Sequence, residues 1–161
     1  RLRTLEQVEI FHHPADAAAE LKMAEYFSAI AGDAGTPGGS IEVLGRDIPT
    51  LRRGNGVIWF DFRSLCGGPR SQNDYLELAR GYHTVLLSEI PKMSASMASE
   101  ARRFTWLVDI FYDHKVKLIA TADCAPDSLY TEGTQASEFF RTASRLTEMR
   151  SREYLGLPHL S

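Results

Sequence analysis

Thr84-Val85-Leu86-Leu87 is one of two apolar runs that decide the fold, and Val116-Lys117-Leu118-Ile119-Ala120-Thr121-Ala122 is the other. Short runs of this kind are typical of strands that are buried on both faces of a sheet. Between them, from about Met97 to His114, apolar residues recur at helical spacing. A strand, a helix and a second strand in this order predict a parallel βαβ unit, with a buried sheet flanked by helices. The chain is therefore assigned to the α/β class.

The helix between these runs has an apolar face and a polar face. The apolar face holds residues at the spacing that packs against a sheet, namely Ala101, Phe104, Leu107, Val108 and Phe111. The opposite face holds Arg102, Trp106, Asp109 and Asp113, and Arg103 lies on the flank, about 100° from Arg102. A solvated, ion-paired surface is one interpretation of this second face. An arginine that reaches a neighbouring subunit is the other.

Shorter elements surround the βαβ unit. We expect a strand over residues 5–11, a helix over 15–31 and a flexible, glycine-rich loop over 32–40. The sequence also predicts a small antiparallel β unit with short strands at Ile41–Leu44, Ile48–Leu51 and Val57–Phe62. A hairpin-type turn is predicted at 54–56. Two further helices are expected, one over Asp74–Tyr82 with Asn73 as its cap and one over Gln135–Leu155.

Size and composition favour a single domain over residues 1–161. The chain is 43% apolar and 24% charged, and it carries a formal net charge of −3. Without a basic excess, no nucleic-acid partner is expected. No run reaches the roughly 18 apolar residues that a membrane-spanning helix needs, and the first residues lack a signal pattern, so we expect a cytoplasmic protein with no transmembrane segment.

Several kinds of site are absent from the sequence. Cys66 and Cys124 are far apart, and His12-His13 has no partners at ligand spacing, so no metal site is expected. Neither HExxH nor GxSxG occurs, and no Gly-Lys dipeptide is present to form a GxxxxGK[ST] phosphate loop. Glu89 at the end of the first buried run is weak evidence for a Mg²⁺-binding strand end. The isolated chain is predicted neither to bind ATP tightly nor to hydrolyse it.

The last helix carries a polar stripe that has two interpretations. Its members recur at spacings of three and four residues: Glu138, Arg141, Arg145, Glu148 and Arg152. They form either a ladder of surface pairs, each contributing about 0.3 kcal/mol, or a place where Arg141 and Arg145 offer planar guanidinium forks to phosphate oxygens. The adjacent stripe, with Phe139, Ala143, Leu146 and Met149 or Arg150, is expected on the core side.

Five blocks of the sequence, in order over about residues 56–155, resemble the ZapE family of P-loop, AAA+-type ATPases and their mitochondrial AFG-like relatives. The blocks are Gly56–Phe62 with Leu65-Cys66, Asp74–Arg80 with His83–Val85, Glu100–Phe104 with Leu107–Asp109 and Tyr112-Asp113, Val116–Ala120, and Arg141–Met149. Arg1-Leu2-Arg3 is similar to the end of a segment that follows the ATPase core in this family. The loop at 32–40 matches nothing in it.

The resemblance implies the C-terminal portion of a larger ATPase, whose Walker A and Walker B motifs lie upstream of Arg1. The parent protein would use ATP and Mg²⁺, while the isolated chain would hold neither. Arg102 and Arg103 become candidates for an arginine finger, and Arg141 and Arg145 become candidates for sensor-type phosphate contacts.

Partners follow from the same resemblance. They are the upstream ATPase core of the same protein and a protein of the division ring, or in mitochondria a protein under quality control. The alternative is a protein-interaction module of that ATPase without a catalytic part. We expect a partner site on the loop at 32–40 or on the small β unit.

Overall fold

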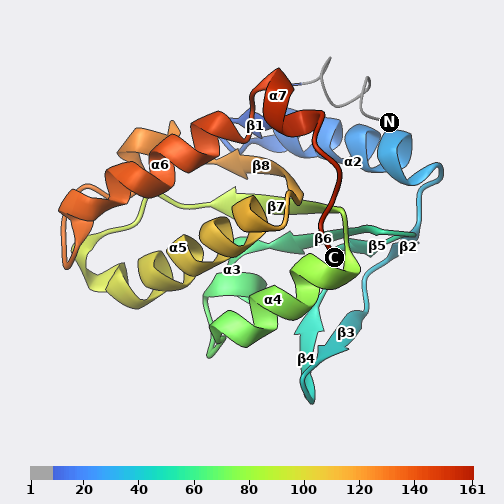
Figure 1. The fold of residues 1–161 in the computed structure, drawn as a ribbon, viewed down its shortest axis with the longest axis horizontal. Helices are drawn as coiled ribbons and strands as arrows, with labels where there is room; N and C mark the ends of the chain where they lie inside the picture. Colours follow the sequence, from blue (N-terminus) through green and yellow to red (C-terminus); the bar gives the residue numbers. More distant parts are fainter. Residues whose placement is uncertain (1–8) are drawn as a thin grey trace.

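The computed structural model describes residues 9–161, and its centre is a six-stranded, mostly parallel sheet (Figure 1). The parallel strands are β1 (Phe11–His12), β8 (Lys117–Ala122), β7 (Thr84–Ile90) and β6 (Val57–Asp61), in this spatial order. Two short antiparallel strands, β5 (Arg52–Arg53) and β2 (Thr36–Pro37), extend the sheet beyond β6. Helix α5 (Ala98–Asp113) connects β7 to β8, so the predicted parallel βαβ unit and the α/β class are confirmed.

Helices cover both faces of the sheet. On one face lies α2 (Ala17–Ala31), on the other lie α3 (Phe62–Cys66), α4 (Gln72–Gly81) and α5, and α6 (Phe139–Glu148) packs beside α5 (Figure 1). Successive strand residues point to opposite faces, because a strand has a period of two. Trp59 and Leu86 therefore pack with Phe27 of α2, whereas Phe60 and Leu87 belong to the larger core on the α5 side. The strands are buried on both faces, as predicted.

A second, separate sheet confirms the predicted small antiparallel β unit, with two strands instead of the predicted three. β3 (Ser40–Val43) and β4 (Arg46–Pro49) form an antiparallel hairpin. The predicted third strand, Val57–Phe62, is instead β6 of the main sheet, and the predicted loop at 32–40 contains β2. The turn at 54–56 does join antiparallel strands, β5 and β6. Alternation along one strand does not reveal a partner far away in the sequence, so the parallel pairing of β6 with β7 was missed.

Two predicted helices have different ends. α4 begins at Gln72, because Ser71 and Asp74, and not Asn73, form its capping box, in which the Asp74 carboxylate accepts from the Ser71 N–H at 2.8 Å. The helix predicted over 135–155 is broken into the 3-10 turn η3 (Ala136–Glu138), α6 and α7 (Arg152–Leu155). Ser151 caps α7 by accepting from the Tyr154 N–H. The predicted polar stripe is therefore not continuous.

The remaining elements are two 3-10 turns, η1 (Ala95–Met97) and η2 (Pro126–Ser128). Most of the strand predicted over 5–11 lies outside the described residues, as does Arg1-Leu2-Arg3. Phe11, the last residue of that predicted strand, is the only one that belongs to β1. Both cysteines are free thiols. Among residues 9–161 no helix has the length and apolarity needed to cross a membrane.

A buried lysine stands at the start of β8. Lys117 is 4% exposed. Its Nζ donates to the carbonyl oxygens of Lys115 and Leu157, each at 2.7 Å, and lies 5.0 Å from the centroid of the Tyr154 ring. Burial, and secondarily the charge of Lys115, lowers the pKa of Lys117 to about 8.

This lowered pKa predicts a specific pH dependence of stability. Between pH 8 and about 10.4 the unfolded chain keeps a proton on Lys117 that the folded chain has released, so the Lys117 contribution to the free energy of unfolding rises with pH. Compared with Lys117→Met, the wild type should gain on the order of 2 kcal/mol over this window. Urea unfolding of both proteins from pH 7 to pH 10 measures the difference. A difference that does not change with pH would contradict the assignment.

The Lys117→Met protein is the necessary reference, because other groups act in the opposite direction at alkaline pH. Burial raises the pKa of Cys66 to about 12 and also raises the pKa values of Tyr75 and Tyr154. The unfolded chain loses these protons first, so their contributions are complete below about pH 9 and are lost as the pH rises further. Both proteins share this loss, and it cancels in the difference.

Candidate functional site

Helices α5 and α6 form a pair whose facing sides are apolar. All residues of the predicted apolar face of α5 are buried. Phe139, Ala143, Leu146 and Met149, the predicted core positions of the last helical segment, are buried as well. The rings of Phe104 and Phe139 stack across the pair with centroids 6.4 Å apart. Because this apolar contact sets how each helix is rotated about its axis, it also sets which polar side chains lie beside the contact.

A cleft of about 190 Å³ lies between α5, η3 and α6. Trp106 and Tyr130 contribute aromatic surface to it. Its polar lining residues are Arg102, Thr105, Asp109, Thr134, Gln135, Glu138, Arg141 and Thr142. Arg102 and Arg141 come from the two different arginine pairs that the sequence singled out. The fold thus brings one member of each pair to the same cleft.

The guanidinium groups of Arg102 and Arg141 have no acidic partner within residues 9–161. Both side chains are exposed. Arg102 lies over the Trp106 ring, with its central carbon 5.6 Å from the ring centroid, a contact that leaves its N–H groups available. Two unpaired guanidiniums on one polar cleft favour an anionic ligand, since their N–H forks match the oxygens of phosphate or carboxylate.

The other two candidate arginines are already engaged. Arg103 donates from Nε to the carbonyl oxygen of Cys66 at 2.7 Å, which ties α5 to the end of α3. Arg145 donates from Nη1 to Oδ1 of Asp109 at 2.7 Å and lies 4.9 Å from the centroid of the Tyr112 ring. Arg145 is therefore paired with a carboxylate of α5 and not with a member of the predicted ladder on its own helix, while Arg141 has no ion pair within residues 9–161.

A second hollow, of about 670 Å³, lies at the carboxyl ends of the parallel strands. Asp61 ends β6, Glu89 lies near the end of β7, and Asp123 follows β8. In open α/β sheets this edge is where ligands usually bind. Of these three acidic residues, only Glu89 was predicted from the sequence as a candidate, and Asp61 and Asp123 were not. Asp61 ends an apolar run and Asp123 follows one, so the sequence did carry a signal for these two acidic residues. That signal indicates a shared site only once the strands are known to be parallel neighbours.

A network of hydrogen bonds holds the backbone around Glu89 in place. Its backbone has a φ of 64°, and its N–H donates to Oγ1 of Thr121 at 2.8 Å. The Glu20 carboxylate of α2 accepts from Ser88 at 2.6 Å and from Thr121 at 2.8 Å. Trp59 donates to Ser88 from Nε1 at 2.8 Å. These bonds fix the end of β7 and connect it to α2.

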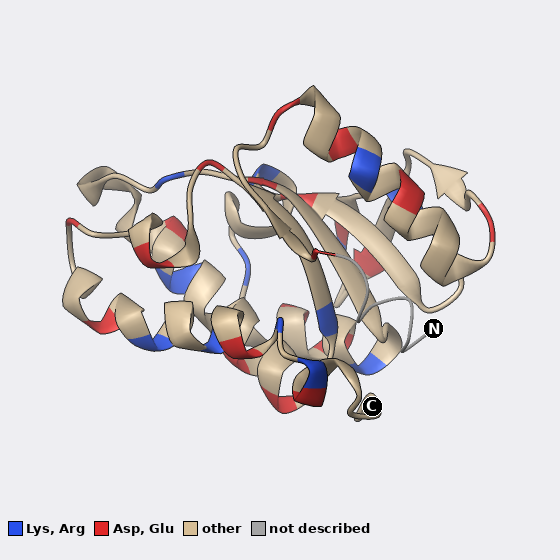
Figure 2. Ribbon diagram, turned by 90° about the horizontal axis from the view of Figure 1, so that it is seen from above, with Lys and Arg blue, Asp and Glu red and all other residues tan. Residues whose placement is uncertain are grey.

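The part of the chain that the structure describes contains no evident metal centre, and its charged residues are of both signs (Figure 2). Acidic and basic residues are interspersed along the helices (Figure 2). Residues 9–161 contain no group of three or more histidine, cysteine or acidic residues placed to hold a metal ion. The Arg102–Arg141 cleft is thus the best-defined candidate for binding a charged ligand.

Comparison with known proteins defines the class. Residues 1–158 match the family of AFG1-like ATPases, and the chain belongs to this family. The cell division protein ZapE of Escherichia coli K12 is 38% identical over all 161 residues. The lactation elevated protein 1 homolog B of Danio rerio is 36% identical over 109 residues, which are 68% of this chain and 22% of that protein. The chain spans only 43% of the length of the E. coli relative. No solved structure matches it.

Proposed function

We propose that this chain is the C-terminal portion of an AFG1-like ATPase and supplies arginines to the nucleotide site of the intact protein. The observation that carries the proposal is the cleft shared by Arg102 and Arg141, neither of which has an acidic partner within residues 9–161. Family membership supports the use of ATP by the parent protein. Magnesium would accompany the nucleotide there, because phosphoryl transfer by such enzymes uses metal-bridged phosphates.

The chemistry expected of these residues is charge stabilisation. The γ-phosphoryl group spreads negative charge over its oxygens in the transition state, and a positioned guanidinium stabilises that charge. Arg102 and Arg141 have free N–H groups for this role. Arg103 and Arg145 remain candidates, but each would first have to leave its present partner, the Cys66 carbonyl or the Asp109 carboxylate.

Reconstitution tests the proposal. Added to a separately expressed upstream ATPase portion, this chain should raise ATP turnover at least tenfold, since an arginine at the phosphoryl group is worth about 10³-fold or more. The double variant Arg102→Ala/Arg141→Ala should fail to stimulate, while Arg80→Ala, which removes an exposed arginine of α4, should stimulate normally. Equal stimulation by the double variant would exclude the arginine cleft as the source.

The proposed cellular role of the parent protein rests on its relatives. The name of the E. coli relative places that protein in cell division. We propose that the parent of this chain couples ATP hydrolysis to cell division or, as in the mitochondrial branch, to protein quality control, in the cytoplasm or its organellar equivalent. A second function, that of an interaction module, is favoured by the β3–β4 hairpin and is developed below.

A further inference from the structure

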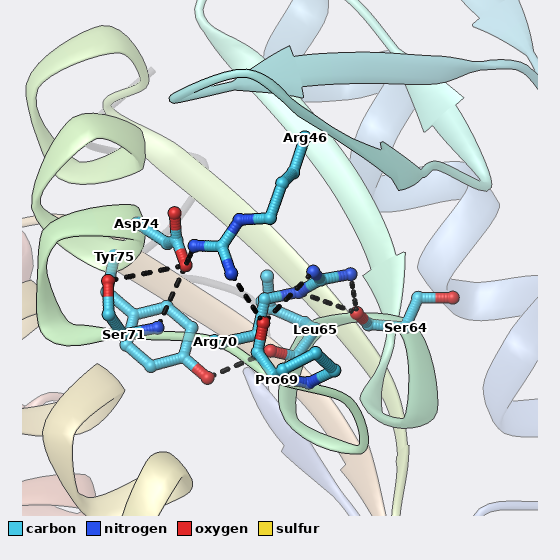
Figure 3. A network of polar contacts seen from close by, with 8 residues as sticks. All are labelled: Arg46, Ser64, Leu65, Pro69, Arg70, Ser71, Asp74 and Tyr75. Carbon is cyan, nitrogen blue, oxygen red and sulfur yellow. Dashed lines mark hydrogen bonds and ion pairs between the residues drawn. The ribbon is translucent and has the colours of Figure 1, made fainter.

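The β3–β4 hairpin is attached to the domain by an ionic network in which the acidic partner is buried and the Arg46 side chain is 43% exposed. Arg46 of β4 pairs through Nη2 with Oδ2 of Asp74 on α4 and donates from Nη1 to the carbonyl oxygen of Pro69 at 2.9 Å (Figure 3). Asp74 is 1% exposed, and the Ser71 N–H donates to the same Oδ2. Removing Arg46 would leave the buried Asp74 carboxylate without its cation, so this pair favours the contact of the hairpin with α4.

The inner face of the hairpin is apolar and reinforces this attachment. Val43 is 6% exposed and Ile48 is 1% exposed, and both belong to the main core, with Ile41 packed against it. Since side chains alternate along a strand, the residues between them point away from the body. The hairpin is therefore a rigid arm with an outer face whose direction is fixed.

The outer face carries two carboxylates directly opposite each other. Glu42 of β3 and Asp47 of β4 are cross-strand neighbours, both are exposed, and neither has an ion pair within the described residues. Like charges in this arrangement destabilise a sheet. A cation from another molecule would remove the repulsion.

The tip of the hairpin has a residue that the turn itself does not favour. Leu44 and Gly45 connect the strands with φ values of 51° and 81°. Two-residue turns with positive φ at both positions prefer Asn-Gly, and a bulky residue at the first position is strained. Leu44 is also 55% exposed, although its neighbours Val43 and Ile48 are buried. Neither local conformation nor burial accounts for a leucine at this position.

We propose that the outer face and tip of the hairpin (Glu42, Leu44 and Asp47) form a docking site for a protein partner. The partner surface presents arginine or lysine side chains around an apolar depression. The basic groups neutralise Glu42 and Asp47, and the depression takes up Leu44. Nucleic acid does not fit this surface, because its phosphates would meet the two carboxylates. The hairpin also lies on a different part of the domain from the α5–α6 pair (Figure 1), so docking is separate from the arginine cleft.

A synthetic helical-hairpin peptide, whose two helices form a leucine-lined groove bordered by arginines, serves as the probe. Its binding to the chain should shift the amide signals of residues 40–49. The double variant Glu42→Lys/Asp47→Lys should weaken binding at least about tenfold, because removing complementary charge both slows association and adds repulsion. Glu25→Lys/Glu132→Lys has the same net charge and changes exposed residues elsewhere, so its effect should stay below about twofold. Equal weakening by both variants, or shifts confined to another surface, would overturn the proposal.

Leu44→Asn separates docking from folding. Asparagine suits the turn better, so the melting temperature should rise by about 2 °C while peptide binding weakens. Binding that is unchanged by this substitution would overturn the role of the tip. In the intact parent protein, Glu42→Lys/Asp47→Lys should leave ATP turnover within about twofold of the parent. A larger loss of turnover would show that the hairpin belongs to the ATPase machinery instead and would overturn the docking assignment.

Discussion

Phe104→Ala is expected to lower the free energy of unfolding by about 3 to 5 kcal/mol, because it removes a fully buried ring and leaves a cavity. Phe104 is 0% exposed, and its ring centroid lies 5.9 Å from that of Phe62 and 6.4 Å from that of Phe139. It therefore connects α5 to α3 and to α6 at once. Urea unfolding measures the loss, and the melting temperature should fall by on the order of 10 °C.

Asp113→Ala provides the matched control on the same helix. Asp113 ends α5, is exposed, and has no ion pair within residues 9–161. Substitutions at such surface positions usually change stability by less than about 0.5 kcal/mol. Two equally small losses for Phe104→Ala and Asp113→Ala would show that the buried face of α5 does not hold the layers together.

The elements that sequence analysis located correctly are those whose pattern is local. The apolar face of α5 was assigned from its spacing alone, and every residue of that face is buried. The runs that became β7 and β8 were recognised as strands because both of their faces had to be apolar. Helix spacing and two-sided burial are properties of a short stretch of chain, so they can be read without knowledge of the rest of the fold.

The errors arose where the outcome depends on distant residues or on a single cap. β6 was assigned to the small antiparallel unit. It does pair antiparallel with β5, but on its other side it pairs parallel with β7, whose position no local pattern reveals. The last helix was extended through Ser151, although a serine side chain that caps the next turn stops the preceding helix. Asn73 was chosen as a cap two residues after Ser71, the actual one, because the reciprocal contact with Asp74 was not considered.

The candidate site shows the same limit. The sequence singled out Arg102, Arg103, Arg141 and Arg145 from helical stripes and from a family resemblance, and all four lie on α5 or α6. It did not predict which of them would remain unpaired. That distinction depends on tertiary neighbours, since the partners of Arg103 and Arg145 are a carbonyl oxygen at the end of α3 and a carboxylate on a different helix.

In the intact parent protein, Arg141→Ala is expected to lower ATP turnover by about 10³-fold while changing the free energy of unfolding by less than about 1 kcal/mol. The side chain is exposed and forms no ion pair with residues 9–161, so the fold does not depend on it. Arg102→Ala should have an effect of similar size, because it lines the same cleft. Steady-state turnover with saturating Mg·ATP, together with urea unfolding, separates the two quantities.

Two further substitutions define what the cleft contributes. Arg141→Lys keeps the charge but loses the planar two-point fork, and it should recover only part of the turnover. Arg145→Ala removes the pair with Asp109 and the contact with the Tyr112 ring, so it should cost more stability than Arg141→Ala and less turnover. If Arg141→Ala instead folds normally and turns over ATP within about twofold of the parent, the change in activation free energy is only about 0.4 kcal/mol. Arg141 would then be a solvated surface residue, and the anion expected in the cleft would not be the transferred phosphoryl group.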